Sequence, residues 1–333
     1  MIRRSPEPAL VALWQIRATT SSTLLLLVIL AAGLFAASAE DPKSRAVGRP
    51  SFRVEVQDAH GVVIADSGKA AQGSDGTSAV LAFHHQYQPG DHIVVAGPSR
   101  MAIRVDDWIP ECVVYLTDSQ HAPFSFDIPF GQGEAETRSP FSRDSFAGDW
   151  HRVTARLLTA QELSNYRNLA MNACDQELQL PVPAGTEMQQ KAFVFPHAST
   201  NSVSRGLPDF RARNAIDGMT QNGHHGIWPY QSWGPELRDD LWWKVDFGRP
   251  VEVDKLRLMV RADFPHDSYW QSAVIEFSDG KQMPIEISQT GEFQDFTFPK
   301  RITSWVRLNK LVPSDPTRWC SFIEVQVWGH DGK

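Results

Sequence analysis

Two stretches of the chain combine aromatic rings with charged and hydrogen-bonding side chains, and these residue types suit the recognition of a sugar. The stretches are residues 224–234 and 261–270. A sugar packs its C–H face on a flat ring, and its hydroxyls need a few fixed polar partners. The aromatic candidates are Trp228, Tyr230, Trp233, Tyr269 and Trp270. The polar candidates are His225, Arg261, Asp263, His266 and Asp267.

Both stretches are predicted to be loops, and loops on a rigid scaffold carry most binding residues. We therefore expect the two loops to form one ligand-binding site. Burial in the core is the alternative for each tryptophan. Of the neighbours Trp242 and Trp243, alternation along a strand buries one.

Pairs of carboxylates raise the alternative of a glycoside hydrolase-like enzyme, which needs two acids roughly 5–10 Å apart. The candidate pairs are Asp263 with Asp267, Asp106 with Asp107 and Asp239 with Asp240. Solvated turns explain these acids more simply, because neighbouring residues on a strand face opposite sides. The sequence contains no HExxH, GxSxG or Walker motif. We expect binding without catalytic turnover.

The elements that must position the two loops are short strands. Apolar and polar residues alternate in 52–56, 255–260 and 274–277, and a Pro89-Gly90-Asp91 turn separates two further apolar runs. Strands at this spacing predict an all-β chain of two β-sandwiches. A capping box over 159–162 predicts one helix that ends before Asn172 and joins the two sandwiches.

The amino-terminal segment has the pattern of a secretory signal peptide. Arg3, Arg4 and Arg17 precede the apolar run 24–37, and an Ala-Ser-Ala site ends at Ala39. We expect a secreted, periplasmic or cell-surface protein, with an uncleaved signal-anchor as the alternative. The expected organisation is a signal peptide at 1–39, a linker at 40–50, a sandwich at 51–150, a helix and linker at 151–194, and a carbohydrate-binding domain at 195–330.

Charge and cysteine content limit the partners. The chain has a formal net charge of -7, which does not favour nucleic acid because phosphate binding needs clustered Lys and Arg. The cysteines are Cys112, Cys174 and Cys320. An odd number leaves at least one unpaired in a monomer, and the sequence does not choose the pair.

The order of motifs in the carboxyl-terminal half resembles the discoidin, or coagulation factor V/VIII type C, domain. These motifs are Asn214-Ala-Ile-Asp217-Gly218, Trp242-Trp243 with Asp246 and Gly248, a strand ending in Arg261, Phe-Ser-Asp-Gly280, and Glu324 to Gly329. That superfamily is galactose-binding-like and includes family 32 carbohydrate-binding modules. The mature chain also resembles an uncharacterised bacterial two-domain carbohydrate-binding group.

The resemblance implies a jelly-roll fold, a glycan or polysaccharide partner and a structural Ca²⁺. Asn214, Asp217 and Glu324 match the family's metal ligands. The resemblance to fucose-binding lectins stops at Arg261-Ala-Asp263, because the flanking basic and histidine positions are not matched. A cell-surface or envelope adhesion module that binds protein remains a further alternative.

Overall fold

A computed structural model describes residues 52–68, 76–119, 122–129, 140–176, 194–224 and 226–332 of the 333 residues. The fold is nearly all β, as predicted. The predicted signal peptide and the linker at 40–50 lie outside these ranges. Among the described residues, no helix has both the length and the apolar character needed to span a membrane.

The amino-terminal half forms two antiparallel sheets around one core. The first has the order β2-β1-β4-β7, made of β1 (Arg53–Gln57), β2 (Val63–Asp66), β4 (His92–Ala96) and β7 (Phe124–Asp127). The second has the order β10-β6-β5-β8-β3, made of β3 (Ser78–His84), β5 (Arg100–Arg104), β6 (Cys112–Leu116), β8 (Trp150–Arg156) and β10 (Val194–Phe195). Alternation drives the burial: Leu81 and Phe83 of β3 are buried, whereas Val80 between Ala79 and Leu81 is exposed.

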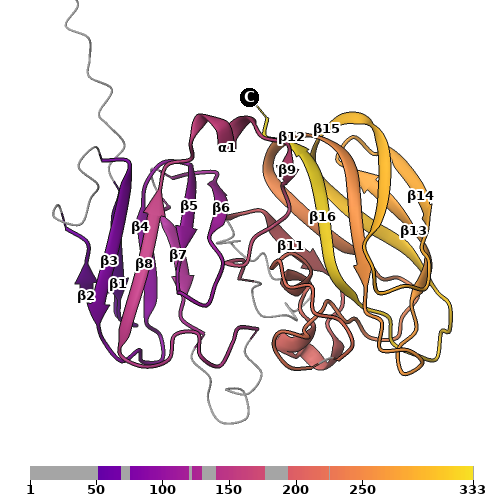
Figure 1. Cartoon of the computed structure of the whole chain (residues 1–333), viewed down its shortest axis with the longest axis horizontal. Coiled ribbons are helices and arrows are strands. Elements are labelled where there is room, and N and C mark those ends of the chain that lie inside the picture. Colours follow the sequence, from indigo (N-terminus) through magenta and orange to yellow (C-terminus); the bar gives the residue numbers. More distant parts are fainter. Residues whose placement is uncertain are drawn as a thin grey trace, which may run out of the picture. The chain divides into compact units, whose positions relative to one another are not determined.

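The carboxyl-terminal half forms one larger sheet system, whose strands β12 to β16 are drawn in orange to yellow in Figure 1. Its order is β14-β13-β15-β12-β16-β9, and β11 also pairs with β12. The strands are β9 (Arg167–Asn168), β11 (His197–Thr200), β12 (Trp243–Val260), β13 (Trp270–Phe277), β14 (Gln282–Glu286), β15 (Gln294–Pro313) and β16 (Phe322–His330). Three short 3-10 turns precede β12: η2 (Ser204–Gly206), η3 (Pro208–Phe210) and η4 (Ala212–Ala215).

The long strand β12 is bent, and the bend determines where its last residue, Val260, lies. Its register against β15 shifts between Asp246 and Val251 and again between Val253 and Lys255. Such bulges bend a strand. Gly248 lies in the first irregularity with a φ of 67°, and a Cβ there would approach the Phe195 ring to 2.3 Å. The bent strand ends at Val260, so Arg261 is the first residue of the following loop.

The predicted helix is much shorter than expected. The capping box is present, because Thr159 and Glu162 each accept from the other's backbone N–H, but α1 covers only Ala160–Ser164. Asn165 then becomes extended, and the next residues pair with β16 as β9. The Asn168 side chain accepts from Val327 N at 3.0 Å, which holds this segment at the sheet edge. Tertiary pairing therefore overrides a local pattern of helical spacing.

The first sandwich also extends beyond the predicted boundary at residue 150. Strand β8 begins at Trp150 and pairs with both β3 and β5. Ala173 and Cys174 are part of the same core. Segment 151–176 therefore contains most of β8, the short helix α1, the two residues of β9 and packed turns.

Candidate functional site

A cavity of about 330 Å³ lies where the end of β12, the loop before β13 and the approach to β16 meet. Its lining residues are Ser204, Arg205, Phe210, Gly234, Glu236, Arg261, His266, Asp267, Trp319 and Ser321. Backbone hydrogen bonds fix the three segments to one another. Arg261 N donates to Ser321 O at 3.0 Å, and Ser268 N donates to Trp319 O at 2.9 Å. The positions of the cavity walls are therefore fixed by residues next to the ends of strands.

The buried polar centre of the cavity is an ion pair between Arg261 and Asp267. Arg261 Nε donates to Asp267 Oδ2 at 2.6 Å, and Nη2 donates to Oδ1 at 2.9 Å. Both side chains are at most 3% exposed. The third guanidinium nitrogen, Nη1, is buried and has no hydrogen-bond partner. A buried donor without a partner is costly, so this atom is a candidate donor to an acceptor oxygen of a ligand.

The rim of the cavity carries one exposed ring. Trp319 lines the cavity and remains 45% exposed, although large aromatic residues usually lie inside. Across the cavity, Arg205 lies over the Phe210 ring with 5.6 Å from Cζ to the centroid. Arg205 N also donates to Glu236 Oε1 at 2.5 Å. An exposed indole beside fixed polar groups is an arrangement that suits a sugar ring.

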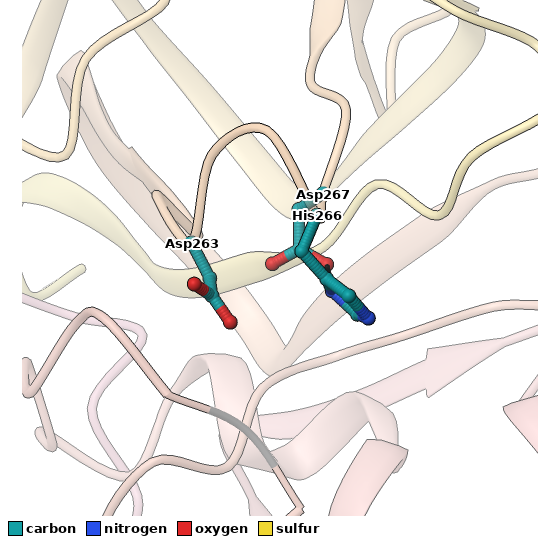
Figure 2. A group of neighbouring side chains, drawn as sticks. All are labelled: Asp263, His266 and Asp267. Atoms are coloured by element: carbon teal, nitrogen blue, oxygen red, sulfur yellow. Dashed lines mark hydrogen bonds and ion pairs between the residues drawn. The ribbon is translucent and has the colours of Figure 1, made fainter.

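Asp263, His266 and Asp267 bring their potential ligand atoms within 4.8 Å of one another. Figure 2 shows Asp263 on one side of the loop and His266 with Asp267 on the other. His266 Nδ1 lies 3.1 Å from Asp267 Oδ1. Because Arg261 already occupies both oxygens of Asp267 with positive charge beside them, we interpret the group as a set of hydroxyl partners rather than a cation site.

The structure brings together only part of the predicted ligand set. Arg261, His266 and Asp267 line the cavity, and Asp263 lies next to them. The prediction of a ring platform is wrong for Trp233 and Trp270, which are 0% and 2% exposed and stack on each other in the core. Tyr269 is half-buried and packs against the same core.

The 224–234 loop does not join the 261–270 loop at this cavity. Trp228 contributes instead to a small cleft with Trp108 and Phe141 of the amino-terminal half. Tyr230 is half-buried beside the exposed His224, with 5.1 Å between ring centroids. His225 lies outside the described residues. The expectation of one site shared by both loops is therefore not met, apart from Gly234 at the end of the first loop.

A larger concavity of about 670 Å³ lies on the other side of the segment 318–321. Alternate residues of this segment face the two hollows: Arg318 and Cys320 line the larger one, Trp319 and Ser321 the smaller one. The larger hollow is lined in part by the apolar residues Leu241 and Leu311, and its charged residues are exposed or half-buried. We favour the smaller cavity because it contains a buried charged pair with an unused donor.

A second polar cluster contains two of the predicted metal ligands. Asp217 and Glu324 are 4% and 0% exposed, and Gly218 N donates to Glu324 Oε2 at 3.3 Å. Burial raises the pKa of Asp217 to about 6. Burial, and then the charge of Asp217, raises the pKa of Glu324 well above its ordinary value. Glu324 Oε1 has no hydrogen-bond partner, so the two carboxylates fit a cation that needs oxygen ligands.

Asn214 fits the metal set less well. Its Oδ1 accepts from Arg213 Nη1 at 3.1 Å, and its Nδ2 donates to Pro208 O at 2.9 Å. The Asn214 side chain therefore fixes the loop. Arg213 Nη1 also lies 3.7 Å from Asp217 Oδ2 and supplies part of the positive charge that the carboxylates need.

Sequence reasoning missed Trp319, Arg205, Glu236 and Phe210. The signal for Trp319 was a lone tryptophan in the polar run 314–321 just before the last strand. For Arg205 and Glu236 there was no signal, because their place depends on Ser204 N pairing with Gly234 O.

The carboxyl-terminal half of the chain matches one family model, and solved structures are similar to the chain. Residues 197–325 match the family model of the F5/8 type C domain, and this part of the chain is such a domain. Among solved structures, a chitosan-binding module from a Paenibacillus sp. IK-5 chitosanase/glucanase is 22% identical, covering 49% of this chain and 98% of that one with a TM-score of 0.33.

Two further structures are similar. The family 32 carbohydrate-binding module of C. perfringens NanJ, in complex with galactose, is 14% identical and covers 39% of this chain and 91% of that one, with a TM-score of 0.31. A Streptococcus pneumoniae fucose-binding module is 17% identical and covers 49% of this chain and 98% of that one, with a TM-score of 0.34. No curated protein matches the chain.

Proposed function

We propose that the F5/8 type C domain of this chain, residues 197–325, binds a glycan in the Arg261 cavity and does not turn it over. The observation that carries the proposal is the buried Nη1 of Arg261, a donor without a partner in a cavity wall. A sugar hydroxyl is a suitable acceptor for it, and Asp267 and His266 are close enough to complete the set. Trp319 supplies the ring on which the sugar packs.

The charge around the cavity favours a neutral sugar. Arg205 and Arg261 are matched by Glu236 and Asp267, and His266 adds charge only when protonated. A carboxylated or sulfated sugar would need an excess of cationic groups to offset its desolvation. The hydroxyls of a neutral sugar can instead use donors and acceptors of both kinds.

The same contacts argue for binding rather than hydrolysis. A glycosidase needs one carboxylic acid to give a proton and a second carboxylate free to act on the other face of the sugar. Both oxygens of Asp267 are held by Arg261, and Glu236 Oε1 accepts from Arg205 N. These groups are therefore placed to hold hydroxyls in fixed positions.

A glycan array followed by titration calorimetry tests the proposal. Trp319→Ala removes the ring from an exposed site, and Arg261→Lys keeps a charge for Asp267 but removes Nη1. Each should weaken binding about tenfold, since one buried hydrogen bond or ring contact contributes roughly 1–3 kcal/mol. Trp150→Ala is the matched control, because Trp150 is 73% exposed on the amino-terminal sandwich. Parental affinity in folded Trp319→Ala and Arg261→Lys proteins would place the ligand elsewhere.

Two further parts of the proposal concern calcium and export. Asp217 and Glu324 would hold Ca²⁺ and fix the loops around them, with backbone carbonyls completing the shell. The apolar run and Ala-Ser-Ala site would direct export and cleavage after Ala39. Sequencing of the mature amino terminus should then begin at Glu40, whereas an intact Met1 in the membrane fraction would indicate a signal-anchor.

A further inference from the structure

The larger hollow, of about 670 Å³, adjoins the Arg261 cavity. Glu236 lines both hollows, and alternate residues of the segment 318–321 face one or the other. Trp319, on the cavity side of that segment, is 45% exposed. A ligand that packs on this ring therefore has to cross only one segment of chain to reach the larger hollow.

The irregular end of β15 forms one wall of the larger hollow. The register of β15 against β13 shifts twice between Trp270 and Val274, and Lys310 has a φ of 49°. A regular strand would turn alternate residues to opposite sides, but here the consecutive residues 310–313 all line the hollow. A positive φ is unfavourable for lysine, and backbone strain of this kind is concentrated at binding and catalytic sites.

The lining of the larger hollow differs in chemistry from that of the Arg261 cavity. The described uncharged residues that line it are all hydrophobic, and Leu237 and Val312 among them are 47% and 42% exposed. The charged heads at its rim have partners of their own, as where Arg238 donates through two nitrogens to Asp240. Such a hollow favours a ligand group that removes apolar surface from water.

We propose that the larger hollow binds an apolar group attached to the sugar in the Arg261 cavity. The ligand is then a glycan with an acyl or alkyl substituent, as in a glycolipid. This inference rests on the proposed function, because the bound sugar fixes where the apolar group begins. The apolar group passes over the segment 318–321 and lies against the exposed side chains of Leu237 and Val312.

The test compares methyl and octyl glycosides of galactose, glucose, N-acetylglucosamine and fucose by titration calorimetry with the full chain, below the micelle concentration of the octyl compounds. For a sugar that binds, the octyl glycoside should bind about 100-fold more tightly than the methyl glycoside, because its additional CH₂ groups leave water. Equal affinity within the pair would overturn this inference, leave the proposed function standing and favour a second sugar unit in the larger hollow. No binding by any of these glycosides would count against both proposals.

Variants of exposed residues test whether the larger hollow is the place. In the Leu237→Ser/Val312→Ser protein, the affinity for the octyl glycoside should fall to that for the methyl glycoside, which itself stays unchanged. Ile302→Ser is the matched control, because Ile302 is a 67% exposed residue of the same strand β15 outside the lining of the hollow. Trp319→Ala should weaken both glycosides by the same factor. An octyl advantage that persists in the folded double variant would place the apolar group elsewhere and overturn the proposal.

Discussion

Asp217 and Glu324 are two carboxyl groups in one buried environment, and at the scale of single residues they should determine how stability depends on pH. Folding raises the pKa of Asp217 from 3.8 to about 6. A raised pKa means that the folded state holds the proton more tightly. The stabilising contribution of Asp217 to the free energy of unfolding is therefore fully present at pH values below its pKa in the unfolded state. It is lost as the pH rises through its pKa in the folded state. The loss for Asp217 is about 3 kcal/mol.

In chelator, the protein should melt at a lower temperature at about pH 7.5 than at about pH 5. Added Ca²⁺ should remove this difference, because an ion that binds only the folded state stabilises it by mass action. Differential scanning calorimetry at the two pH values measures both effects. The Asp217→Asn/Glu324→Gln protein should show neither, and identical parental curves in calcium and chelator at neutral pH would contradict the ion.

Residue types in the sequence predicted three of the residues that line the candidate cavity, for a clear physical reason. Arg261, His266 and Asp267 lie within seven residues of one another, so a single loop brings them together. Trp233 and Trp270 were wrongly predicted to lie on the surface. The sequence alone does not distinguish a tryptophan that enters the core at the end of a strand from one that is exposed in a loop. Trp233 N pairs with Phe322 O, a contact between residues far apart in the chain.

At the scale of elements, the segment around Gly234 sets the spacing between the 3-10 turns and the approach to β16. A Cβ on Gly234 would lie 2.8 Å from Phe210 Cδ1 and 3.3 Å from Ser321 Oγ. Gly234→Ala should therefore push these cavity walls apart and destabilise the domain by about 1–3 kcal/mol. Urea denaturation measures the loss, and glycan affinity should fall with it.

A double-mutant cycle separates the effect of the contact with Phe210 from any other destabilisation that an alanine at position 234 causes. Phe210→Leu makes room at the ring, so Gly234→Ala should cost less in that background. Equal costs in both backgrounds would show that the Phe210 contact is not the cause.

Strands were predictable where one face is buried, whereas the length of the helix was not. The alternation in 255–260 and 274–277 falls within β12 and β13, because each strand packs one face on the core. The 159–170 pattern fits a helical face equally well, yet Leu169 and Ala170 are buried by a chain that runs extended along β16. Pairing with a strand about 160 residues away is invisible in local spacing.

At the scale of the whole molecule, Asp331 near the carboxyl terminus links distant parts of the chain. Its side chain is 2% exposed, bonds Arg249, and accepts from Arg167 at 2.9 Å. Arg249 also lies over Tyr115 of β6, and Arg100 of β5 donates to Gly332 O at 3.1 Å. These contacts join the last residues to strands of both sandwiches, and no local sequence pattern predicted them.

Asp331→Asn should destabilise the protein strongly, because it leaves two largely buried guanidinium groups without their carboxylate. Breaking a buried pair in this way costs about 3–5 kcal/mol. Burial disfavours the ionised carboxyl, but Arg249 and then Arg167 outweigh it and lower the pKa of Asp331 below 3.8. Its stabilising effect is therefore present at neutral pH and is lost only as pH falls below about 4, opposite to Asp217. Urea denaturation at neutral pH measures the loss, with Asp239→Asn as an exposed control; equal stability of the two variants would show that the buried cluster contributes nothing.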